Sequence, residues 1–404
     1  MADTLKPRDA RDVEEAVRFA LGNGTPLEVV GRGSKRAIGR PGQTDLTLDL
    51  SDLSGVTLYE PDELILSAKA GTPIAEIEAL LASRHQELAF EPADYGPLLG
   101  GAAGEGTIGG VIATNLSGPR RIKAGAARDH FLGVHGVTGR GDSIKSGGRV
   151  VKNVTGYDLC KVLAGSWGTL AAMTEVTVKV LPKAETEASI VVHGLDDAQA
   201  ARAMAAALGS PFDVSGAAHL PDHVTSHFGV LPDARAATVL RLEGFAPSVA
   251  HRSEALSTLM KPYGERAVLT QAQSQALWRD IRDVRPFAAG DNAARPLWRV
   301  SVTPGEAHKV AAAITPAAQM VYDWGGGLIW SAMPFADEPD SAAIRGAVAA
   351  AGGHATLIRA AAAVRASAEV FEPQAPGLAA LGKRIKDSFD PKGVLNPGRM
   401  YAGV

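Results

Sequence analysis

Residues 100–158 read GGAAGEGTIGGVIATNLSGPRRIKAGAARDHFLGVHGVTGRGDSIKSGGRVVKNVTGYD and are rich in glycine and in basic side chains. Between Pro119 and Lys152 they include eight Lys or Arg residues against two Asp residues, in a chain whose formal net charge is −3. Glycines let backbone N–H groups approach a bulky anion, and clustered cations offset its charge. The segment therefore predicts a site for a phosphate-bearing ligand. A long solvated surface loop is the alternative that charge alone would allow.

The composition indicates a globular protein with more than one domain. The 404 residues are enough for two or three domains, and 46% of them are hydrophobic. A pI near 6.4 gives no overall attraction to nucleic acid. The single cysteine, Cys160, excludes an internal disulfide and a metal cluster held only by this chain's own thiolates. The charged N-terminal residues do not resemble a signal peptide, and no window approaches the roughly 18 apolar residues of a membrane span, so we expect a cytoplasmic location.

The first half alternates helices and strands, with glycine-rich loops between them. Apolar spacing predicts helices over residues 9–21, 73–81 and 156–163 and strands over residues 27–30, 46–50, 64–70, 129–138 and 173–181. We expect Thr72 to cap the second helix, with Pro73 as its first residue. The first strand runs into Gly31-Arg-Gly-Ser-Lys, a plausible phosphate cradle.

The segment Gly104-Glu-Gly-Thr-Ile-Gly109 matches the pattern G-x-G-x-x-G of nicotinamide dinucleotide sites. In those sites the motif follows a strand, whereas here it follows a run rich in proline and glycine over residues 92–104. The match therefore does not predict a nicotinamide cofactor.

The pattern changes after Glu185. Strands are expected over residues 189–193, 214–220, 237–243, 297–303, 319–324, 327–333 and 355–360, and helices over residues 196–208, 247–261, 306–313 and 341–351. Each half of this series resembles a split βαβ arrangement, which predicts one antiparallel sheet with helices on one face. A last helix over residues 378–389 and the segment after it have no partner of their own, so we expect them to dock on another domain.

Several short motifs follow one another in a specific order. They are Gly31-Arg-Gly-Ser-Lys, Ala70-Gly-Thr-Pro, Thr107-Ile-Gly-Gly, Ala113-Thr-Asn, Ser117-Gly-Pro-Arg-Arg, Arg128-Asp, Val151-Lys-Asn-Val-Thr-Gly-Tyr-Asp, Gly165-Ser-Trp-Gly-Thr-Leu, Thr174-Glu-Val-Thr and Phe389-Asp-Pro-Lys-Gly-Val-Leu-Asn-Pro-Gly-Arg. Together they resemble the FAD-binding domain of the vanillyl-alcohol oxidase and p-cresol methylhydroxylase (PCMH) superfamily. Within it, Glu91-Pro-Ala-Asp-Tyr-Gly, Lys152-Asn-Val-Thr-Gly-Tyr-Asp-Leu and Gly352-Gly-His-Ala-Thr most resemble the FAD-binding E subunits of bacterial glycolate oxidases.

The resemblance implies an α+β fold. A two-lobed PCMH-type FAD-binding domain would span residues 1–183, and a ferredoxin-like antiparallel α+β cap domain would span residues 184–375. A C-terminal segment, residues 376–404, would return to the FAD domain. FAD should be held noncovalently, because Ser34 and Lys35 stand where many relatives carry the histidine that attaches it.

The resemblance also assigns roles to single residues. The first loop would wrap the diphosphate, Val176 would meet the adenine through its backbone, and Asn396 would approach the flavin ring. Lys152 and Arg399 are candidates for a cation near that ring, where it would raise the reduction potential. The expected cofactor-binding residues are Gly31, Arg32, Gly33, Ser34, Lys35, Gly71, Pro92, Ile108, Gly109, Gly110, Thr114, Asn115, Ser117, Arg120, Gly125, Asp129, Lys152, Val176 and Asn396.

The function that the resemblance implies is that of an FAD-binding subunit in a complex that oxidises glycolate to glyoxylate and passes electrons to an iron–sulfur subunit. A separate catalytic FAD subunit is a further expected partner. Relatives that oxidise 2-hydroxy acids carry a histidine in a metal-binding segment of the cap, where this chain has Gly325-Gly-Gly-Leu-Ile-Trp. The complex could associate with the inner face of the cell membrane. Two alternatives stay open: a subunit that keeps FAD only for assembly, and a stand-alone FAD-dependent dehydrogenase of another 2-hydroxy acid.

Three histidines, His219, His223 and His227, fall four residues apart and would align as metal ligands on a helix. Pro221 interrupts the series, so we favour a solvent-facing helix and predict no metal site.

Overall fold

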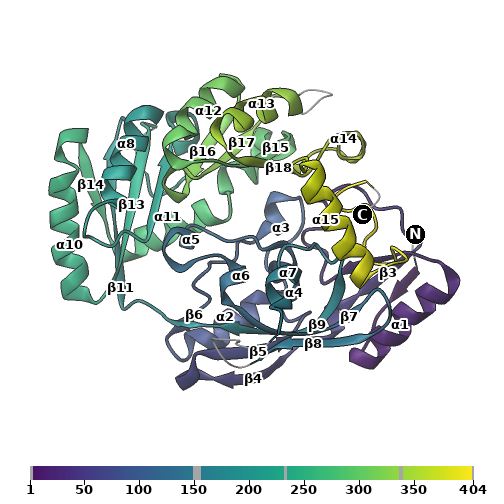
Figure 1. Ribbon diagram of the computed structural model, residues 1–404. Helices are drawn as coiled ribbons and strands as arrows, with labels where there is room; N and C mark the ends of the chain where they lie inside the picture. Colours follow the sequence, from purple (N-terminus) through teal and green to yellow (C-terminus); the bar gives the residue numbers. More distant parts are fainter. Residues whose placement is uncertain (1–2, 149–155, 232–233, 336–339, 403–404) are drawn as a thin grey trace. The chain divides into compact units, whose positions relative to one another are not determined.

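The computed structural model describes residues 3–148, 156–231, 234–335 and 340–402. The chain divides into two compact units (Figure 1). The first consists of Met1–Ser117, Gly125–Lys183 and Pro373–Val404, and the second of Gly118–Ala124 and Ala184–Glu372. The sequence did not predict that residues 118–124 leave the first unit to join the second.

Two main sheets organise the first unit. A three-stranded parallel sheet has the order β1 (Asp3–Leu5), β3 (Leu46–Asp49), β2 (Leu27–Val30). A five-stranded antiparallel sheet has the order β4 (Val56–Glu60), β5 (Ile65–Lys69), β9 (Ala171–Lys179), β7 (Phe131–Thr138), β8 (Ser143–Gly147). A short pair joins β6 (Gln86–Glu87) to β10 (Leu181–Pro182).

The helices of this unit pack on the sheets through apolar faces. Helix α1 (Ala10–Asn23) begins after Asp9, whose carboxylate accepts hydrogen bonds from the N–H groups of Arg11 and Asp12, and ends at Gly24 with a φ of 63°. The other helices are α2 (Ile74–Ala82), α3 (Tyr95–Leu98), α4 (Ile108–Thr114), α6 (Ala127–His130), α7 (Leu159–Leu163) and α15 (Pro376–Phe389). Helices α2, α4 and α7 contribute Ile77, Ile112 and Leu163 to one core with β5, β7 and β9.

The cap predicted for α2 is wrong by one position. Pro73 is the N-cap, and α2 begins at Ile74. The hydroxyl of Thr72 donates instead to the carbonyl of Lys69 (2.6 Å) and accepts from the N–H of Gly55 (2.9 Å). Thr72 therefore closes the turn after β5 and does not cap the helix.

One antiparallel sheet of eight strands forms the second unit (Figure 1). Its order is β14 (Arg266–Leu269), β11 (Thr186–His193), β13 (Ala237–Gly244), β12 (Gly216–Leu220), β16 (Gln319–Asp323), β17 (Leu328–Ala332), β15 (Leu297–Ser301), β18 (His354–Arg359). Its longer helices are α8 (Asp197–Leu208), α10 (Ala246–Leu259), α11 (Gln271–Arg282), α12 (Ala307–Ile314) and α13 (Ser341–Ala351). Strand β14 and helix α11 were not predicted. The short helix α5 (Arg121–Ala124) also belongs to this unit.

The three histidines do not share a helix. His219 lies on β12 and is 1% exposed, whereas His223 lies on the short helix α9 (Asp222–Thr225). The prediction of one solvent-facing helix is therefore wrong. The described residues contain no group of three or more His, Cys, Asp or Glu side chains placed to hold a metal ion.

The C-terminal segment belongs to the first unit, as the sequence predicted. Leu395 forms a parallel bridge with Leu27 of β2, and the N–H of Asn396 donates to the carbonyl of Leu27 (2.9 Å). The α+β architecture and the return of the tail are thus both observed.

Candidate cofactor-binding site

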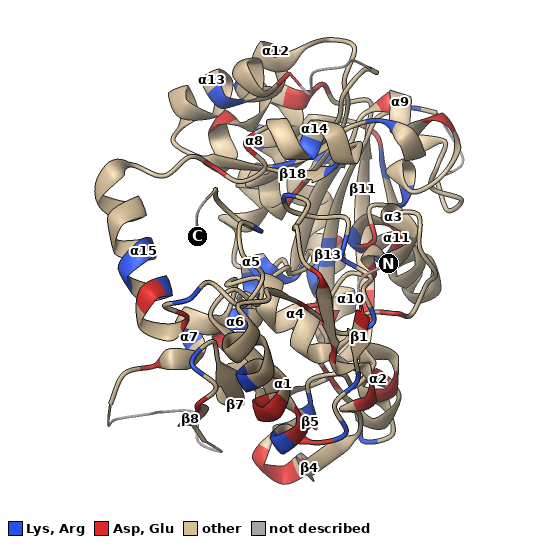
Figure 2. Cartoon of the chain, turned by 90° about the vertical axis from the view of Figure 1, so that its right-hand side faces the viewer, with Lys and Arg blue, Asp and Glu red and all other residues tan. Residues whose placement is uncertain are grey.

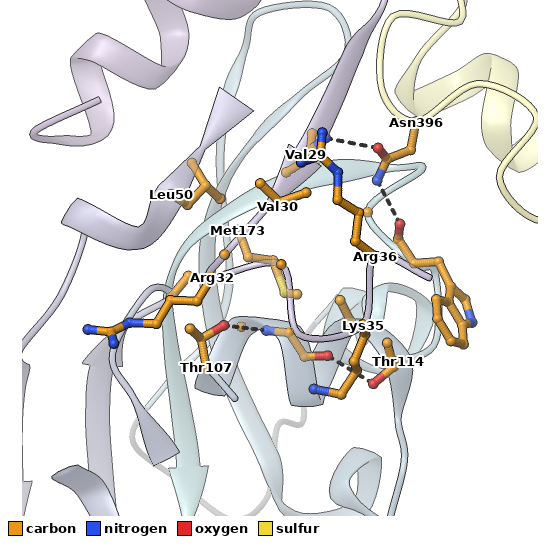
Figure 3. Close-up of a pocket in the computed structure, with 18 of the residues that line it drawn as sticks. Val29, Val30, Arg32, Lys35, Arg36, Leu50, Thr107, Thr114, Met173 and Asn396 are labelled. Atoms are coloured by element: carbon orange, nitrogen blue, oxygen red, sulfur yellow. Dashed lines mark hydrogen bonds between the residues drawn. The ribbon is translucent and has the colours of Figure 1, made fainter. Parts of the chain in front are cut away.

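A pocket opens in the first unit where the end of β2, the start of α4, strand β9 and the C-terminal segment come together (Figure 3). Its walls come from six separate segments of the chain. The lining residues are Val29, Val30, Gly31, Arg32, Gly33, Ser34, Lys35, Arg36, Leu50, Ala70, Thr107, Gly109, Gly110, Ala113, Thr114, Trp167, Gly168, Ala171, Met173, Asn396 and Arg399.

The pocket wall is cationic. Among these lining residues none is Asp or Glu, and four are Lys or Arg. Three of the cations have acidic partners behind the wall: Glu28 pairs with Arg36 and with Arg399, and Glu105 pairs with Arg32 at 3.3 Å. A wall without carboxylates and with cationic donors suits a phosphate group.

Lys35 is the cation whose charge is least compensated. Its side chain is 8% exposed, and its Nζ lies 6.0 Å from the centre of the Tyr95 ring. Among the residues that the structure describes, none forms a hydrogen bond or an ion pair with Nζ of Lys35. Burial lowers the pKa of Lys35 to about 8, although the charge of Asp94 acts in the opposite direction. An anion in the pocket would recover much of the energy that burial of this ammonium costs.

Glycines let α4 pack closely against the first loop and against Ala70, which follows β5. A Cβ on Gly31 would lie 2.5 Å from Oγ1 of Thr107, and one on Gly109 would lie 2.7 Å from Cβ of Ala70. The backbone N–H groups of Ile108 and Gly109 already donate to the carbonyls of Thr72 and Ala70. The backbone donors of Ile108 and Gly109 are therefore used within the chain, and the lack of a Cβ on Gly109 lets α4 pack directly on Ala70.

Asn396 is locked into the pocket wall. Its Oδ1 accepts from the N–H of Val29 (2.9 Å), and its Nδ2 donates to the carbonyl of Trp167 (2.8 Å). A Cβ on Gly168 would lie 2.7 Å from this Nδ2. Asn396 and Trp167 have φ values of 43° and 56°, so both ends of this contact lie in the left-handed region. The amide thus ties the tail to the strand that leads into the first loop.

A buried ion pair fixes the tail behind Asn396. Nζ of Lys386 on α15 donates to Oδ2 of Asp390 (2.6 Å) and to the carbonyls of Thr169 (2.7 Å) and Leu395 (2.9 Å). The carboxylate of Asp390 accepts from the N–H groups of Val394 and Leu395. All three ammonium donors are used, which satisfies the condition for burying such a pair.

The structure brings nine of the predicted residues into this pocket. They are Gly31, Arg32, Gly33, Ser34, Lys35, Gly109, Gly110, Thr114 and Asn396. Ile108 lies just behind the wall, fully buried at the start of α4.

Four other predicted residues organise the chain just after α4. Oδ1 of Asn115 accepts from the N–H of Arg128 (2.9 Å), Oγ of Ser117 accepts from the N–H of Ala127 (2.9 Å), and Oδ2 of Asp129 accepts from the N–H of Ala126 (2.8 Å). Gly125 has a φ of 87°, and a Cβ there would lie 2.9 Å from Oδ2 of Asp129. These side chains hold the start of α6 in place.

Three predicted residues lie in the framework of the first unit. The N–H of Gly71 donates to the carbonyl of Leu53 (2.8 Å), and Pro92 is buried. Val176 is fully buried in β9, between β5 and β7. Their contact with a cofactor stays a prediction.

Two predicted residues lie elsewhere. Arg120 belongs to the second unit, where its Nε and Nη2 donate to Glu243 (2.9 and 2.7 Å). The carboxylate of Glu243 therefore pairs with the guanidinium that we expected to contact the cofactor. Lys152 lies outside the described residues.

Sequence reasoning missed several residues of the wall. Thr107 caps α4 and accepts from the N–H of Gly110 (3.3 Å), and Trp167, Gly168 and Met173 line the pocket beside Asn396. Thr107 and the pair Trp167-Gly168 lie in motifs that carried the resemblance, but no role was given to them. For Trp167-Gly168, the signal that the sequence offered was a glycine next to an aromatic residue at a turn.

Comparison with known proteins finds matching families and relatives. The family described as FAD binding domain matches residues 2–147, and the family described as FAD linked oxidases, C-terminal domain, matches residues 364–400. Glycolate oxidase subunit GlcE of Escherichia coli (strain K12) is 34% identical over 389 residues, which cover 96% of each chain. Glycolate oxidase subunit GlcD of Bacillus subtilis (strain 168) is 29% identical over 188 residues, which cover 46% of this chain and 38% of the relative.

Solved structures share the fold. The structure of p-cresol methylhydroxylase with substrate bound gives a TM-score of 0.73 at 13% identity, covering 99% of this chain and 88% of the other. Alkyldihydroxyacetonephosphate synthase gives a TM-score of 0.71 at 15% identity, covering 98% and 75%. Identities this low support the fold alone. None of the helices in the described ranges has the length and apolar character needed to span a membrane.

Proposed function

Because this chain belongs to the family of the glycolate oxidase subunit GlcE, we propose that it is the FAD-binding subunit of a glycolate oxidase complex, which converts glycolate to glyoxylate. The chain is an FAD-binding oxidoreductase of the FAD-linked oxidase type. The observation that carries the proposal is the pocket without carboxylates around the buried ammonium of Lys35.

The residues present fit FAD. Gly31, Gly33 and Ser34 would surround its diphosphate, and Lys35 would offset the negative charge. Asn396, which is hydrogen-bonded to Val29 and Trp167, would lie against the cofactor where the C-terminal segment lines the pocket. When bound, FAD would accept the two electrons that glycolate loses when it is oxidised to glyoxylate. Neither Ser34 nor Lys35 has the side chain that attaches FAD covalently in many relatives, so we expect noncovalent binding.

The chain works as part of a multi-subunit complex, and we propose a catalytic FAD subunit and an iron–sulfur subunit as its partners. Cys160 is buried, and burial raises the pKa of its thiol to about 11. One protonated thiol in a core is unsuited to ligate a cluster, so an iron–sulfur relay needs another chain. Attachment of the complex to the inner face of the cell membrane would come through such a partner.

One experiment tests the proposal. The chain is purified alone, loaded with FAD and mixed with glycolate under anaerobic conditions, while the flavin absorbance is followed at about 450 nm. We expect one FAD per chain and no bleaching until the partner subunits are added, when bleaching and glyoxylate should appear. Failure to bind FAD would contradict the proposal. Bleaching by glycolate without partners would instead favour a stand-alone dehydrogenase, and no bleaching with partners would favour an assembly role.

A further inference from the structure

The first two turns of α15 are apolar and exposed. Residues 376–381 read Pro-Gly-Leu-Ala-Ala-Leu, and all six are exposed, with Leu378 at 55% and Leu381 at 44%. Figure 2 shows this half of the helix in tan, without a charged residue. A contiguous apolar surface that stays in contact with water is typical of an interaction site.

This apolar surface continues the face by which α15 packs on its own unit. Ile385 and Phe389 pack against the core of the first unit around β5, β7 and β9. Leu381 lies four residues before Ile385 and Leu378 lies seven before it, a spacing that puts these side chains on one side of the helix. The face is therefore packed in its second half and exposed in its first.

The charges beside the exposed leucines are positive. Residues 376–392 contain four Lys or Arg and two Asp, and each Asp pairs with the lysine four positions before it. Arg384, three residues after Leu381, is exposed, and none of the described residues forms a hydrogen bond or an ion pair with its guanidinium. A protein surface that carries carboxylates would complement this cation.

The same helix holds the wall of the cofactor pocket. Nζ of Lys386 donates to the carbonyl of Leu395 (2.9 Å), next to Asn396, which lines the pocket. Leu381 precedes Lys386 by five residues, which is about 8 Å along the helix axis. A protein bound to the first two turns of α15 would therefore lie close to the cofactor. Because electrons pass only between redox centres that are close together, this position suits a partner that takes electrons from the flavin.

We propose that the first two turns of α15 are the docking site of the electron-accepting iron–sulfur subunit, in an apolar groove edged by carboxylates. Helices that bind in such grooves use apolar anchors three or four residues apart, as Leu378 and Leu381 are. Arg384 would contact the carboxylates at the edge of the groove. The identity of the partner rests on the proposed function, whereas the docking face itself rests on the exposed leucines. A membrane is the other class of occupant, but one unpaired cation gives little attraction to anionic lipids.

Binding measurements on the FAD-loaded full chain test this surface. The chain is immobilised, and the purified iron–sulfur subunit is titrated over it by surface plasmon resonance at low and at high salt. We expect Leu378→Ser and Leu381→Ser each to raise the dissociation constant about tenfold or more, because a few buried anchors carry most of the energy of an interface. Arg384→Gln should slow association and weaken its dependence on salt.

The matched control is Phe245→Ser. It removes a side chain that is 75% exposed at the start of α10 in the second unit, and it should leave the dissociation constant unchanged. All four variants should bind FAD as the wild type does, because none of these side chains lines the cofactor pocket.

Several outcomes would overturn the docking site. They are an unchanged dissociation constant in both leucine variants, an equal loss in Phe245→Ser, or no binding of the iron–sulfur subunit by the wild type. Leucine variants that are less stable in urea but bind the subunit normally would show that the face is covered within the chain. Binding to vesicles of anionic phospholipid that is lost in Leu378→Ser would assign the face to a membrane instead. A chain that holds no FAD, yet binds the subunit through these leucines, would contradict the proposed function and support the docking site.

Discussion

Lys35 is the residue on which the charge of the cofactor pocket most depends. The other three cations of the wall have acidic partners behind them, whereas the Lys35 ammonium is buried next to Tyr95. Its pKa of about 8 means that it is mostly protonated at neutral pH and loses its proton in mildly alkaline solution. A bound diphosphate would favour the protonated form, so its binding and the protonation of Lys35 are linked.

The first prediction concerns Lys35→Met. We expect the dissociation constant of FAD to rise about tenfold or more, since a charge-assisted hydrogen bond contributes about 1.5–3 kcal/mol. In the wild type the affinity should be constant below pH 8. Above pH 8 it should fall by up to about tenfold per pH unit, because the free protein must then take up a proton to bind. Fluorescence titrations with FAD from pH 6 to 10 measure both effects.

The control for this prediction is Lys309→Met, which removes an exposed lysine paired with Glu306 in the second unit. It should leave FAD affinity and its pH dependence unchanged. A Lys35→Met variant that still loses affinity above pH 8 would show that another group is responsible.

Helix α15 shows how one element positions the pocket from outside it. The helix carries two i,i+4 Lys–Asp pairs: Lys386–Asp390 is buried, and Lys383–Asp387 is exposed. Burial lowers the pKa of Lys386, although Asp390 acts to raise it. Only the buried pair contacts the chain that leads to Asn396, through the carbonyl of Leu395.

The second prediction compares these two pairs. Lys386→Met leaves Asp390 buried and unpaired, so we expect a loss of about 3–5 kcal/mol in the free energy of unfolding and weaker FAD binding as Asn396 shifts. Lys383→Met should change stability by less than about 0.5 kcal/mol. Urea unfolding followed by circular dichroism measures both variants. Equal stability of the two would mean that the buried pair does not hold the tail.

At the scale of the whole molecule, sequence patterns predicted the helices, strands and loops whose structure depends mainly on neighbouring residues. The loop Gly31–Lys35 follows its strand as expected, and α1 and seven of the eight strands of the second unit lie close to their predicted ranges. The error at Arg120 comes from a contact across a long sequence separation. Arg120 reads as part of a basic loop because Glu243, its partner, lies 123 positions later. The hydrogen bonds of Asn396 to Val29 and Trp167 are equally invisible in sequence, and only the resemblance pointed to this residue.

Two units with separate cores should lose their structure in separate steps. Burial would by itself raise the pKa of Glu243, but Arg241 and Arg120 more than offset it and hold the pKa at about 2. The folded pKa lies below the unfolded value, so the stabilisation is complete above about pH 4.5 and is lost as the pH falls toward 2. A difference of this size corresponds to about 3 kcal/mol, all of it in the second unit.

The third prediction follows for scanning calorimetry. FAD should raise only the midpoint temperature at which the first unit unfolds, because ligand binding stabilises the part that holds the ligand. Glu243→Gln should lower only the midpoint temperature of the second unit, because it removes the carboxylate that pairs with Arg120 and Arg241. The same substitution should remove most of the dependence of that midpoint on pH between 4.5 and 2. Glu265→Gln, which breaks the exposed pair with Arg235, is the matched control and should change neither transition. A single transition that moves with FAD and with Glu243→Gln alike would show instead that the two cores unfold as one cooperative body.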